Sequence, residues 1–310
     1  MHSPLGKATN VQTPSLRGKK AKAVFYTLLA GILWGTSFPV IKVGLDYMTP
    51  YTFVFLRFLV AALVMVVIMV AARKLTLPSK QWKLILFLGV INGIAYVMQY
   101  IGMNYTTAAK AALFISLDVV WVAMMSPIIL KEKFGIQKTL GVLAALVGIV
   151  FLTTNMDVSL LRGGQLFGDL LLVATGMVWA VFMIYNKSVI SDGKSVLSTL
   201  TWIVLGTLLP MLPFAFSAGT QAIALPIQAW LAIVYTAVAC WVIPFYLFME
   251  GLKTITPSTS TILQLSQVVV AAIISSLVLG EAFTAIAVAG AVFIILATIL
   301  VSYNHDKTEQ

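Results

Sequence analysis

The chain is made almost entirely of long apolar runs, and their length limits the kind of structure that it can form. The hydrocarbon core of a bilayer is about 30 Å thick, so a helix needs about 20 apolar residues to cross it. The 310-residue sequence contains ten such runs, with predicted bounds of 23–45, 50–72, 83–104, 107–130, 137–154, 168–187, 196–216, 229–250, 257–279 and 282–303. The connections between them are too short to hold a soluble domain. The sequence therefore predicts an all-α integral membrane protein with ten transmembrane helices.

The composition agrees and excludes several functional classes. Only 10% of the residues are charged and the mean hydropathy is +1.01, whereas a soluble globular protein carries about 25% charged residues. Both histidines, His2 and His305, lie in the tails, so no imidazole is available within the membrane as a base or a metal ligand. The single cysteine, Cys240, can form neither an intrachain disulfide nor a thiolate cluster. We therefore expect no metal site and no cofactor.

The basic residues predict the orientation of the chain in the membrane. Lys and Arg in short loops stay preferentially on the cytoplasmic side. If the amino terminus is inside, sixteen of the twenty basic residues lie inside, Arg162 lies outside, and three lie within spans. We therefore expect a multi-pass protein of the inner or plasma membrane with cytoplasmic tails at 1–22 and 304–310. We interpret the net charge of +10 as a signal for the orientation of the chain in the membrane and not for nucleic-acid binding, so we expect no nucleic-acid partner. A cleaved signal peptide is the alternative for the first run, but that run is full length and lacks a convincing cleavage site.

The sequence also repeats itself. At an offset of 145 residues, Gly31, Trp34 and Lys42 match Gly176, Trp179 and Lys187; at an offset of 149, Gly102, Val119, Val120, Glu132 and Gly141 match Gly251, Val268, Val269, Glu281 and Gly290. The chain therefore divides into two five-helix halves, 23–155 and 166–303. Because five is odd, the second half is predicted to lie inverted in the membrane. Inverted repeats are typical of secondary transporters, whose site lies between the halves, although a duplication without a transport role is the alternative.

Short motifs on these repeats carry a family resemblance. They are Trp34-Gly35-Thr36-Ser37-Phe38 followed by Pro39, Leu56-Arg57-Phe58, and the acidic corners at Glu132 and Glu281. With the duplicated layout, they resemble the drug/metabolite transporter superfamily, and the five-helix unit resembles its EamA type. The resemblance implies a ten-helix carrier with a central cavity, often an exporter of amino acids, other metabolites or toxic compounds, that works by alternating access. The family often has proline midway along the fourth helix of each half, where this chain has Asp118 and Gln267.

Asp118 is the first candidate for a functional residue. It lies near the middle of its span, where a carboxylate costs about 2.5–3.5 kcal/mol to insert. In one interpretation it faces a wet cavity and binds an amine or a coupling proton; in the other it is a structural carboxyl bonded to a neighbouring helix. Its repeat mate Gln267 and the nearby Gln264 are predicted at a similar depth, where the three side chains would form a polar floor for a small zwitterion.

Three basic residues lie within predicted spans. Lys110 is expected either to receive a substrate carboxylate or to extend to the lipid headgroups. Lys42 is interpreted as an anchor of the latter kind. For Arg57 we expect a structural partner such as Asp46 or a helix-end carbonyl, with contact to an anionic substrate as the alternative.

Amides and aromatic residues complete the set of candidates. Asn92 and Gln99 share one helix face at a spacing of seven, as Gln264 and Gln267 do at a spacing of three, and amides within a membrane need protein or water as partners. The spans at 83–104, 107–130 and 257–279 are therefore expected to line the cavity. The aromatic candidates within spans are Trp34, Tyr96, Trp121 and Trp241. Such residues are ordinarily packing, but facing a cavity they would suit an amphipathic or aromatic substrate.

The sequence thus predicts a secondary transporter of small metabolites, such as amino acids, amines or related amphipathic compounds. No phosphate-binding loop of the G-x-x-x-x-G-K-[ST] type is present, so we expect an ion gradient, with protons as the candidate ion, or exchange to drive transport. A membrane-embedded enzyme is the alternative, and a receptor or scaffold is the third. The chain is not predicted to be an enzyme, because no nucleophile with a base is set up by spacing. Export is an expectation from the resemblance alone.

Overall fold

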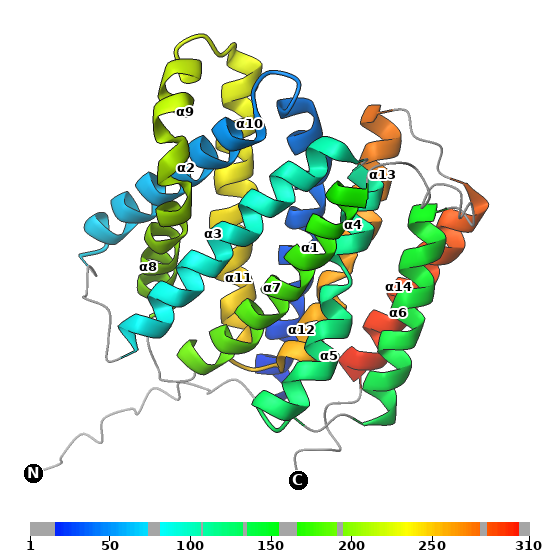
Figure 1. The fold of residues 1–310 in the computed structure, drawn as a ribbon. Coiled ribbons are helices and arrows are strands. Elements are labelled where there is room, and N and C mark those ends of the chain that lie inside the picture. The colour runs from blue at the N-terminus through cyan, green and yellow to red at the C-terminus, as the bar shows by residue number, and fades with distance from the viewer. Residues whose placement is uncertain are drawn as a thin grey trace, which may run out of the picture.

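The structure is a bundle of helices that run roughly side by side (Figure 1). It is a computed structural model and describes residues 16–73, 81–106, 108–132, 135–154, 166–190, 195–279 and 284–303, apart from the side chains at 16, 17, 108–110, 152–154, 279 and 301–303. Every regular element in these ranges is helical. The prediction of an all-α protein is therefore confirmed for the described part of the chain.

Six of the predicted spans each coincide with one continuous helix. These helices are α1 (Leu16–Gly44), α2 (Pro50–Ala71), α3 (Trp82–Tyr105), α6 (Ile136–Thr154), α7 (Leu166–Ile190) and α14 (Ala285–Tyr303). The start of α2 shows why the boundaries follow the sequence. Thr49 caps the helix by accepting a hydrogen bond from the backbone N–H of Thr52 at 3.3 Å, and Pro50 occupies the first helical position, where its missing N–H costs nothing.

The other four predicted spans are each built from two or three helical pieces. They are α4 (Ala108–Ile115) with α5 (Asp118–Ile129); α8 (Val196–Leu208) with the 3₁₀ turn η2 (Leu209–Phe214) and α9 (Ala215–Ala222); α10 (Ile227–Ala237) with the π-helical η3 (Val238–Val242) and α11 (Ile243–Leu252); and α12 (Pro257–Gln264) with α13 (Ser266–Leu279). The sequence predicts each of these as one span, with a kink or loosening at Pro127 and Pro244, and the π-helical η3 lies just before Pro244. Those interruptions are the main new feature of the fold.

The chain has many helices that are long and apolar enough to cross a membrane. Eight helical segments of 19 to 27 residues meet the length and composition of a membrane span, and two shorter apolar helices, Ile136–Phe151 and Ala285–Leu300, accompany them. These two short helices, in α6 and α14, pack against each other at the edge of the bundle (Figure 1). The remaining helices enclose the centre of the molecule.

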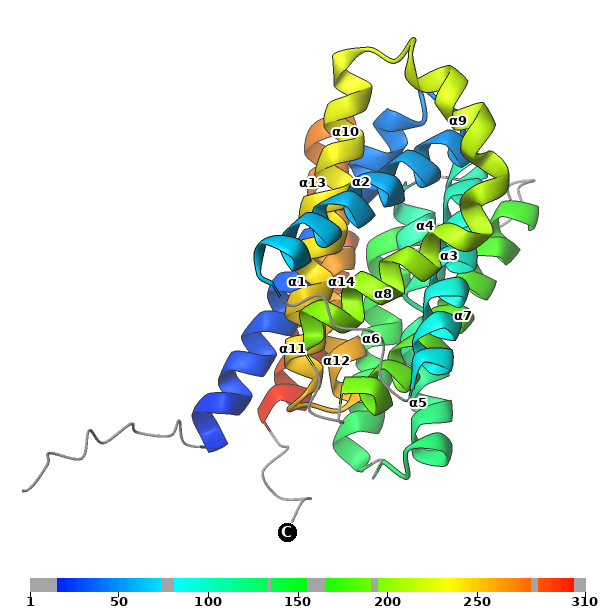
Figure 2. The same ribbon diagram turned by 90° about the vertical axis from the view of Figure 1, so that its left-hand side faces the viewer.

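Both described ends of the chain lie at one face of the bundle. Figures 1 and 2 place the start of α1 and the end of α14 at their lower edge, together with the end of α5 and the start of α12. We call this face the N-terminal face. The loops at the opposite face connect α1 with α2 and α9 with α10.

Repeat-mate glycines make equivalent contacts in the two halves. A Cβ atom on Gly31 of α1 would lie 3.1 Å from the carbonyl oxygen of Gln264, and one on Gly176 of α7 would lie 2.8 Å from the carbonyl oxygen of Ile115. Each glycine therefore lets its helix approach the backbone of a broken helix in the other half, at the end of α12 or α4. These two contact points are themselves repeat mates, because 264 − 115 = 149.

Two repeat-mate lysines also make equivalent contacts. Lys42 donates a hydrogen bond to the carbonyl oxygen of Met103 at 2.8 Å, near the end of α3, and Lys187 donates to that of Leu252 at 2.7 Å, at the end of α11. A cation at a helix carboxyl terminus neutralises the carbonyls that have no partner within the helix. Lys42 therefore binds a neighbouring helix end, whereas the sequence analysis interpreted it as an anchor to the lipid headgroups.

The two broken helices are interrupted at equivalent positions. The backbone N–H of Val119 bonds to the carbonyl of Ser116 at 3.3 Å, and that of Val268 bonds to the carbonyl of Leu265 at 3.0 Å. Each bond spans three residues, so the helix tightens for one turn instead of unwinding, a geometry that often marks a hinge. Neither break contains the proline that the family resemblance leads one to expect there.

The close contact at Gly176 gives a test of this packing. A Cβ atom there would overlap the backbone of Ile115 and force the helices apart, so Gly176→Ala is expected to destabilise the protein by about 1–3 kcal/mol. Thermal unfolding of the purified protein in detergent measures the change. Gly219→Ala in α9 is the control, since no atom lies within 4 Å of its Cβ position and alanine favours a helix by about 1 kcal/mol over glycine. Equal midpoints for the two variants would contradict the proposed contact.

Candidate functional site

A cavity lies between the two halves, at the level of the helix breaks. Its fourteen lining residues come from α1, α2, α3 and α5 of the first half and from α7, α11, α12 and α13 of the second. They are Trp34, Ser37, Phe38, Arg57, Tyr96, Gln99, Asp118, Trp179, Phe182, Met183, Phe245, Phe248, Gln264 and Gln267. Apart from Trp179, all of these residues are buried. Residues distant in sequence therefore meet at one enclosed place.

Twelve of the fourteen lining residues form six repeat-mate pairs. At an offset of 145 they are Trp34/Trp179, Ser37/Phe182 and Phe38/Met183; at an offset of 149 they are Tyr96/Phe245, Gln99/Phe248 and Asp118/Gln267. The same positions of each half therefore surround the cavity. Within the pairs the chemistry differs, because the first half supplies Ser37, Gln99 and Asp118 where the second half supplies two phenylalanines and an amide.

The cavity is small in this structure. Its volume is about 40 Å³, which is room for a few water molecules. Sites for small organic ligands ordinarily measure about 300–1,000 Å³. The helices around the cavity must therefore move apart before a metabolite can enter.

Arg57 on α2 is a fully buried cation without a carboxylate partner among the described side chains. It donates a hydrogen bond from Nη1 to the Tyr100 hydroxyl at 2.8 Å and one from Nη2 to the carbonyl oxygen of Cys240 at 3.2 Å. Cys240 lies in the π-helical η3, just before Pro244, which has no N–H to donate within the helix. The guanidinium also lies 5.0 Å from the centre of the Tyr96 ring, a favourable cation–π distance. Its Nε has no hydrogen-bond partner among the residues that the structure describes.

The sequence analysis expected a structural partner for Arg57, and in the structure this guanidinium bonds to the carbonyl oxygen of Cys240 in the π-helical η3. Asp46, the other candidate partner from the sequence, is exposed and lies in the turn after α1. Arg57 lines the cavity as well, so its side chain is both held by the protein and accessible to a molecule inside.

Asp118 begins α5 and is 3% exposed. The structure records no ion pair to it from a described side chain, although the side chain of Lys110, eight residues earlier, lies outside the described set. Gln264 and Gln267, at the break between α12 and α13, line the same cavity, and Nε2 of Gln264 has no hydrogen-bond partner within the described ranges. The structure thus brings Asp118 and the two glutamines together at the cavity.

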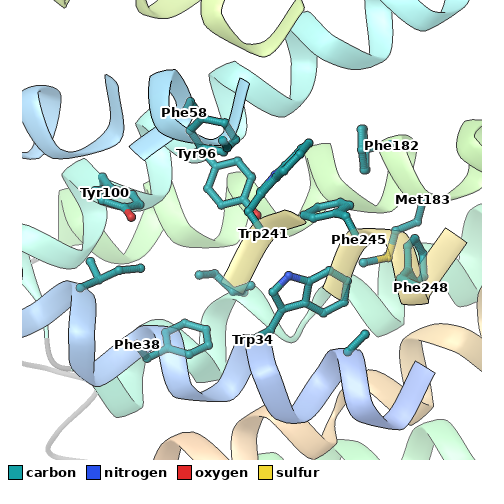
Figure 3. Packing of buried hydrophobic residues seen from close by; sticks show 14 of the residues in the cluster. Trp34, Phe38, Phe58, Tyr96, Tyr100, Phe182, Met183, Trp241, Phe245 and Phe248 are labelled. Carbon is teal, nitrogen blue, oxygen red and sulfur yellow. The ribbon is translucent and has the colours of Figure 1, made fainter. Parts of the chain in front are cut away.

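Part of the lining is apolar. Figure 3 shows Phe182, Met183, Phe245 and Phe248 gathered on one side, with Tyr96 on the other. The rings pack closely, with centroid distances of 5.8 Å for Phe182–Phe245 and 5.0 Å for Trp34–Phe245. We call Phe182, Met183, Phe245 and Phe248 the apolar wall. The cavity lining therefore combines charged and amide groups with an apolar wall.

The remaining predicted candidates lie elsewhere. Asn92 is buried and donates a hydrogen bond to Thr207 of α8 at 3.1 Å. Trp241 is buried behind the lining, against Phe58 and Phe245. Trp121 belongs to α5 but not to the cavity lining. The structure therefore places Gln99, Trp34 and Tyr96 at the cavity and these three outside it.

The sequence analysis missed the apolar wall together with Ser37 and Phe38 as cavity-lining residues. Phenylalanine and methionine in a membrane helix carry no signal that separates cavity from lipid. The repeat offsets could have found them, because Phe245 and Phe248 are the mates of the candidates Tyr96 and Gln99. Spans at 83–104, 107–130 and 257–279 were expected to line the cavity, and α1, α2, α7 and α11 also contribute.

Comparison with known proteins gives the family. The model of the EamA-like transporter family matches residues 21–154 and again 166–303. An "Uncharacterized transporter YyaM" of Bacillus subtilis is 26% identical over 89% of this chain and 93% of its own length. A "Probable amino-acid metabolite efflux pump" of Salmonella typhimurium is 27% identical over 87% of this chain and 91% of its own length.

A solved crystal structure shows the same fold. It is 17% identical, covers 91% of this chain and 98% of its own, and superposes with a TM-score of 0.71. The family and the names of the relatives indicate a transporter rather than an enzyme. With both halves matched and many helices able to span a bilayer, this multi-span membrane protein belongs to the EamA-like transporter family.

Proposed function

We propose that the protein is a secondary exporter of small zwitterions with an apolar side chain, namely amino acids or closely related compounds, and that the cavity is its binding site. Arg57 receives the substrate carboxylate, Asp118 receives the ammonium group, and the apolar wall receives the side chain. Amines that lack the carboxylate are the second candidate class, because they keep the contacts to Asp118 and the wall.

The observation that carries this proposal is that two buried opposite charges lack ionic partners among the described side chains. Arg57 is 1% exposed and Asp118 is 3% exposed, and burying a charge is costly unless a counter-charge or hydrogen bonds compensate it. A zwitterion brings one charge for each of them. A single apolar cation or anion would satisfy only one.

Polar atoms around the cavity add to this argument. Oε1 of Gln99, Nε2 of Gln264 and Nε1 of Trp34 are buried, and none of them has a hydrogen-bond partner in the part of the chain that the structure describes. Buried polar groups are ordinarily hydrogen-bonded, and a site built to bind a polar substrate leaves such groups for it. The apolar wall, by contrast, offers nothing to a highly polar side chain.

Ten crossings in two inverted halves are the topology that we propose for this site. Support comes from α1 beginning and α14 ending at one face, as an even number of crossings requires (Figures 1 and 2). The paired glycine and lysine contacts described above are those expected of two halves related by a pseudo-two-fold axis through the cavity. Counting basic residues makes the N-terminal face cytoplasmic, with both tails on that side.

Export driven by proton exchange is the mode of transport that we propose. The name of the Salmonella relative, an efflux pump, supports the direction. Asp118 would hold the ammonium group of the substrate on the way out and a proton on the way back, so that one carboxylate couples the two fluxes. Neither a receptor nor a scaffold would need these two charges inside the membrane.

Replacing Asp118 with asparagine separates coupling from binding. Because an amide cannot exchange a proton, Asp118→Asn is expected to lose substrate flux driven by a pH gradient in proteoliposomes. Exchange of substrate between the two sides without a gradient should persist, at a raised KM. Asp46→Asn, which removes an exposed loop carboxylate, is the control and should keep both activities. Full gradient-driven flux in Asp118→Asn would contradict the coupling role.

Replacing Arg57 tests the carboxylate contact. Hydrogen bonds to a charged group contribute about 1.5–3 kcal/mol, so Arg57→Met should weaken the binding of an amino acid about 10- to 100-fold. The matching amine, which lacks the carboxylate, should be affected much less, and Arg57→Lys should be intermediate. Size-exclusion chromatography checks that each variant is folded. An equal loss for amino acid and amine would mean that Arg57 is only structural.

A further inference from the structure

We propose that the seam between α5 and α12 is the path that connects the cavity with the N-terminal face, and that a latch centred on Glu132 keeps it closed in this structure. The inference rests on the proposed transport function, and it assigns the path and its closing contacts to residues outside the cavity. α5 belongs to the first half and α12 to the second, and they pack against each other. Their separation would open the cavity on this face.

The latch joins the two halves through one buried carboxylate. Glu132, which follows α5, has a side chain only 5% exposed and pairs with Lys138 of α6. It accepts hydrogen bonds from Ser126 of α5 and from Ser258 of α12, the latter at 3.0 Å. Lys138 in turn donates to the hydroxyl of Thr256, the residue that caps α12, at 3.3 Å. The start of α12 is thus held to the first half by charge-assisted hydrogen bonds, which are the stronger kind.

Glu132 remains ionised in the pH range in which such a carrier works. Burial alone would raise the pKa of its carboxyl, but the hydrogen bonds from Lys138, Ser126 and Thr256 and the charge of Lys138 outweigh burial and hold the pKa below its ordinary value. A lowered pKa means that the contact is present above the ordinary pKa and is lost only as the pH falls through the lowered one. The latch is therefore opened by movement of the helices and not by protonation near neutral pH.

A polar stripe on α12 runs from this latch to the cavity. Thr256, Ser260 and Gln264 are spaced by four residues, so they share one face of the helix over about 12 Å. Ser260 is fully buried, and neither its hydroxyl nor Nε2 of Gln264 has a partner among the described residues. Unpaired buried hydroxyls and amides are costly. Water or a passing polar substrate would satisfy both when the seam opens.

The first half lacks this stripe at the equivalent place. The repeat mates of Ser260 and Gln264 are Ala111 and Ile115, both buried in α4. The packing of the repeat therefore does not require polar side chains at these two positions of α12, because apolar ones pack at the equivalent positions of α4. We interpret Ser260 and Gln264 as serving the passage of a polar molecule.

The helix breaks supply hinges for the movement. α5 starts and α12 ends at the tightened turns beside the cavity, and each of these short helices extends from its break to the N-terminal face (Figures 1 and 2). Each can tilt about its break while α4 and α13 stay in place. Breaking the latch should therefore favour the open seam even when no substrate is present.

A cysteine reporter on the stripe tests this proposal. In a Cys240→Ala background, which leaves no other cysteine, Ser260→Cys is labelled with a membrane-impermeant maleimide in proteoliposomes, and the rate is measured from each side. Glu132→Gln is expected to raise the labelling rate from the N-terminal face by about tenfold or more, because it removes the charge that holds α12. Labelling from the other face should not increase.

A second ion pair in the same region provides a matched control. Glu250 and Lys253, near the end of α11, pair at 2.8 Å within one segment and do not join the halves, so Glu250→Gln should leave the labelling rate unchanged. Ser258→Ala is a second variant for the case in which Glu132→Gln does not fold. It removes one hydrogen bond of the latch without leaving an unpaired charge, so we expect a smaller increase in the labelling rate. Unchanged labelling in folded Glu132→Gln and Ser258→Ala would overturn the proposal.

The reporter works without substrate, so its result is independent of the proposed function. If labelling responds as expected but no amino acid or amine is transported, the path stands and the substrate class is wrong. If transport is found and labelling does not respond, the substrate class stands and the path along α12 is wrong.

Discussion

Two opposite charges buried between the halves are the constraint on which the rest of the structure depends. Arg57 and Asp118 lie where each charge costs about 2.5–3.5 kcal/mol, and the described side chains supply neither with an ionic partner. The protein offsets part of this cost locally. The Tyr100 hydroxyl and the carbonyl oxygen of Cys240, in the π-helical η3, accept hydrogen bonds from Arg57. The two charges, which have no ionic partner among the described side chains, are complementary to the two charges of a zwitterion.

The duplicated packing explains why the cavity lies where it does. Gly31 and Gly176 bring the first helix of each half against the broken helix of the other, so both breaks lie close to the lining. Six pairs of equivalent residues then surround one space. Because the pairs have diverged, with Phe248 as the mate of Gln99 and Gln267 as the mate of Asp118, the lining contains both polar and apolar groups. The duplication supplies the enclosure, and the divergence supplies the chemistry.

The sequence predicted the helical class and the resemblance to the family, because length, hydropathy and spacing within each half are local signals. It also placed Asp118, Gln264, Gln267, Gln99, Trp34 and Tyr96 among the candidates that line the cavity, since polar or aromatic residues stand out in an apolar helix. It missed the apolar wall, because Phe245 and Phe248 differ from lipid-facing residues only by their neighbours in space. It placed Asn92 with the cavity although Asn92 bonds to Thr207 of α8, a partner that only the packing reveals. The breaks at Asp118 and Gln267 were treated as continuous helix, since their sequences contain neither proline nor glycine.

The central claim is that the cavity recognises a carboxylate and an ammonium group on the same molecule. The most direct test is to measure, by calorimetry on the purified protein, the affinities for amino acids with apolar side chains and for the matching amines and carboxylic acids that lack one charge. The account predicts that at least one amino acid binds about tenfold or more tightly than both of its single-charge analogues, since it alone offers a counter-charge to each buried group. An amine or acid that binds as tightly as its amino acid, or the absence of binding by every amino acid tested, would contradict it.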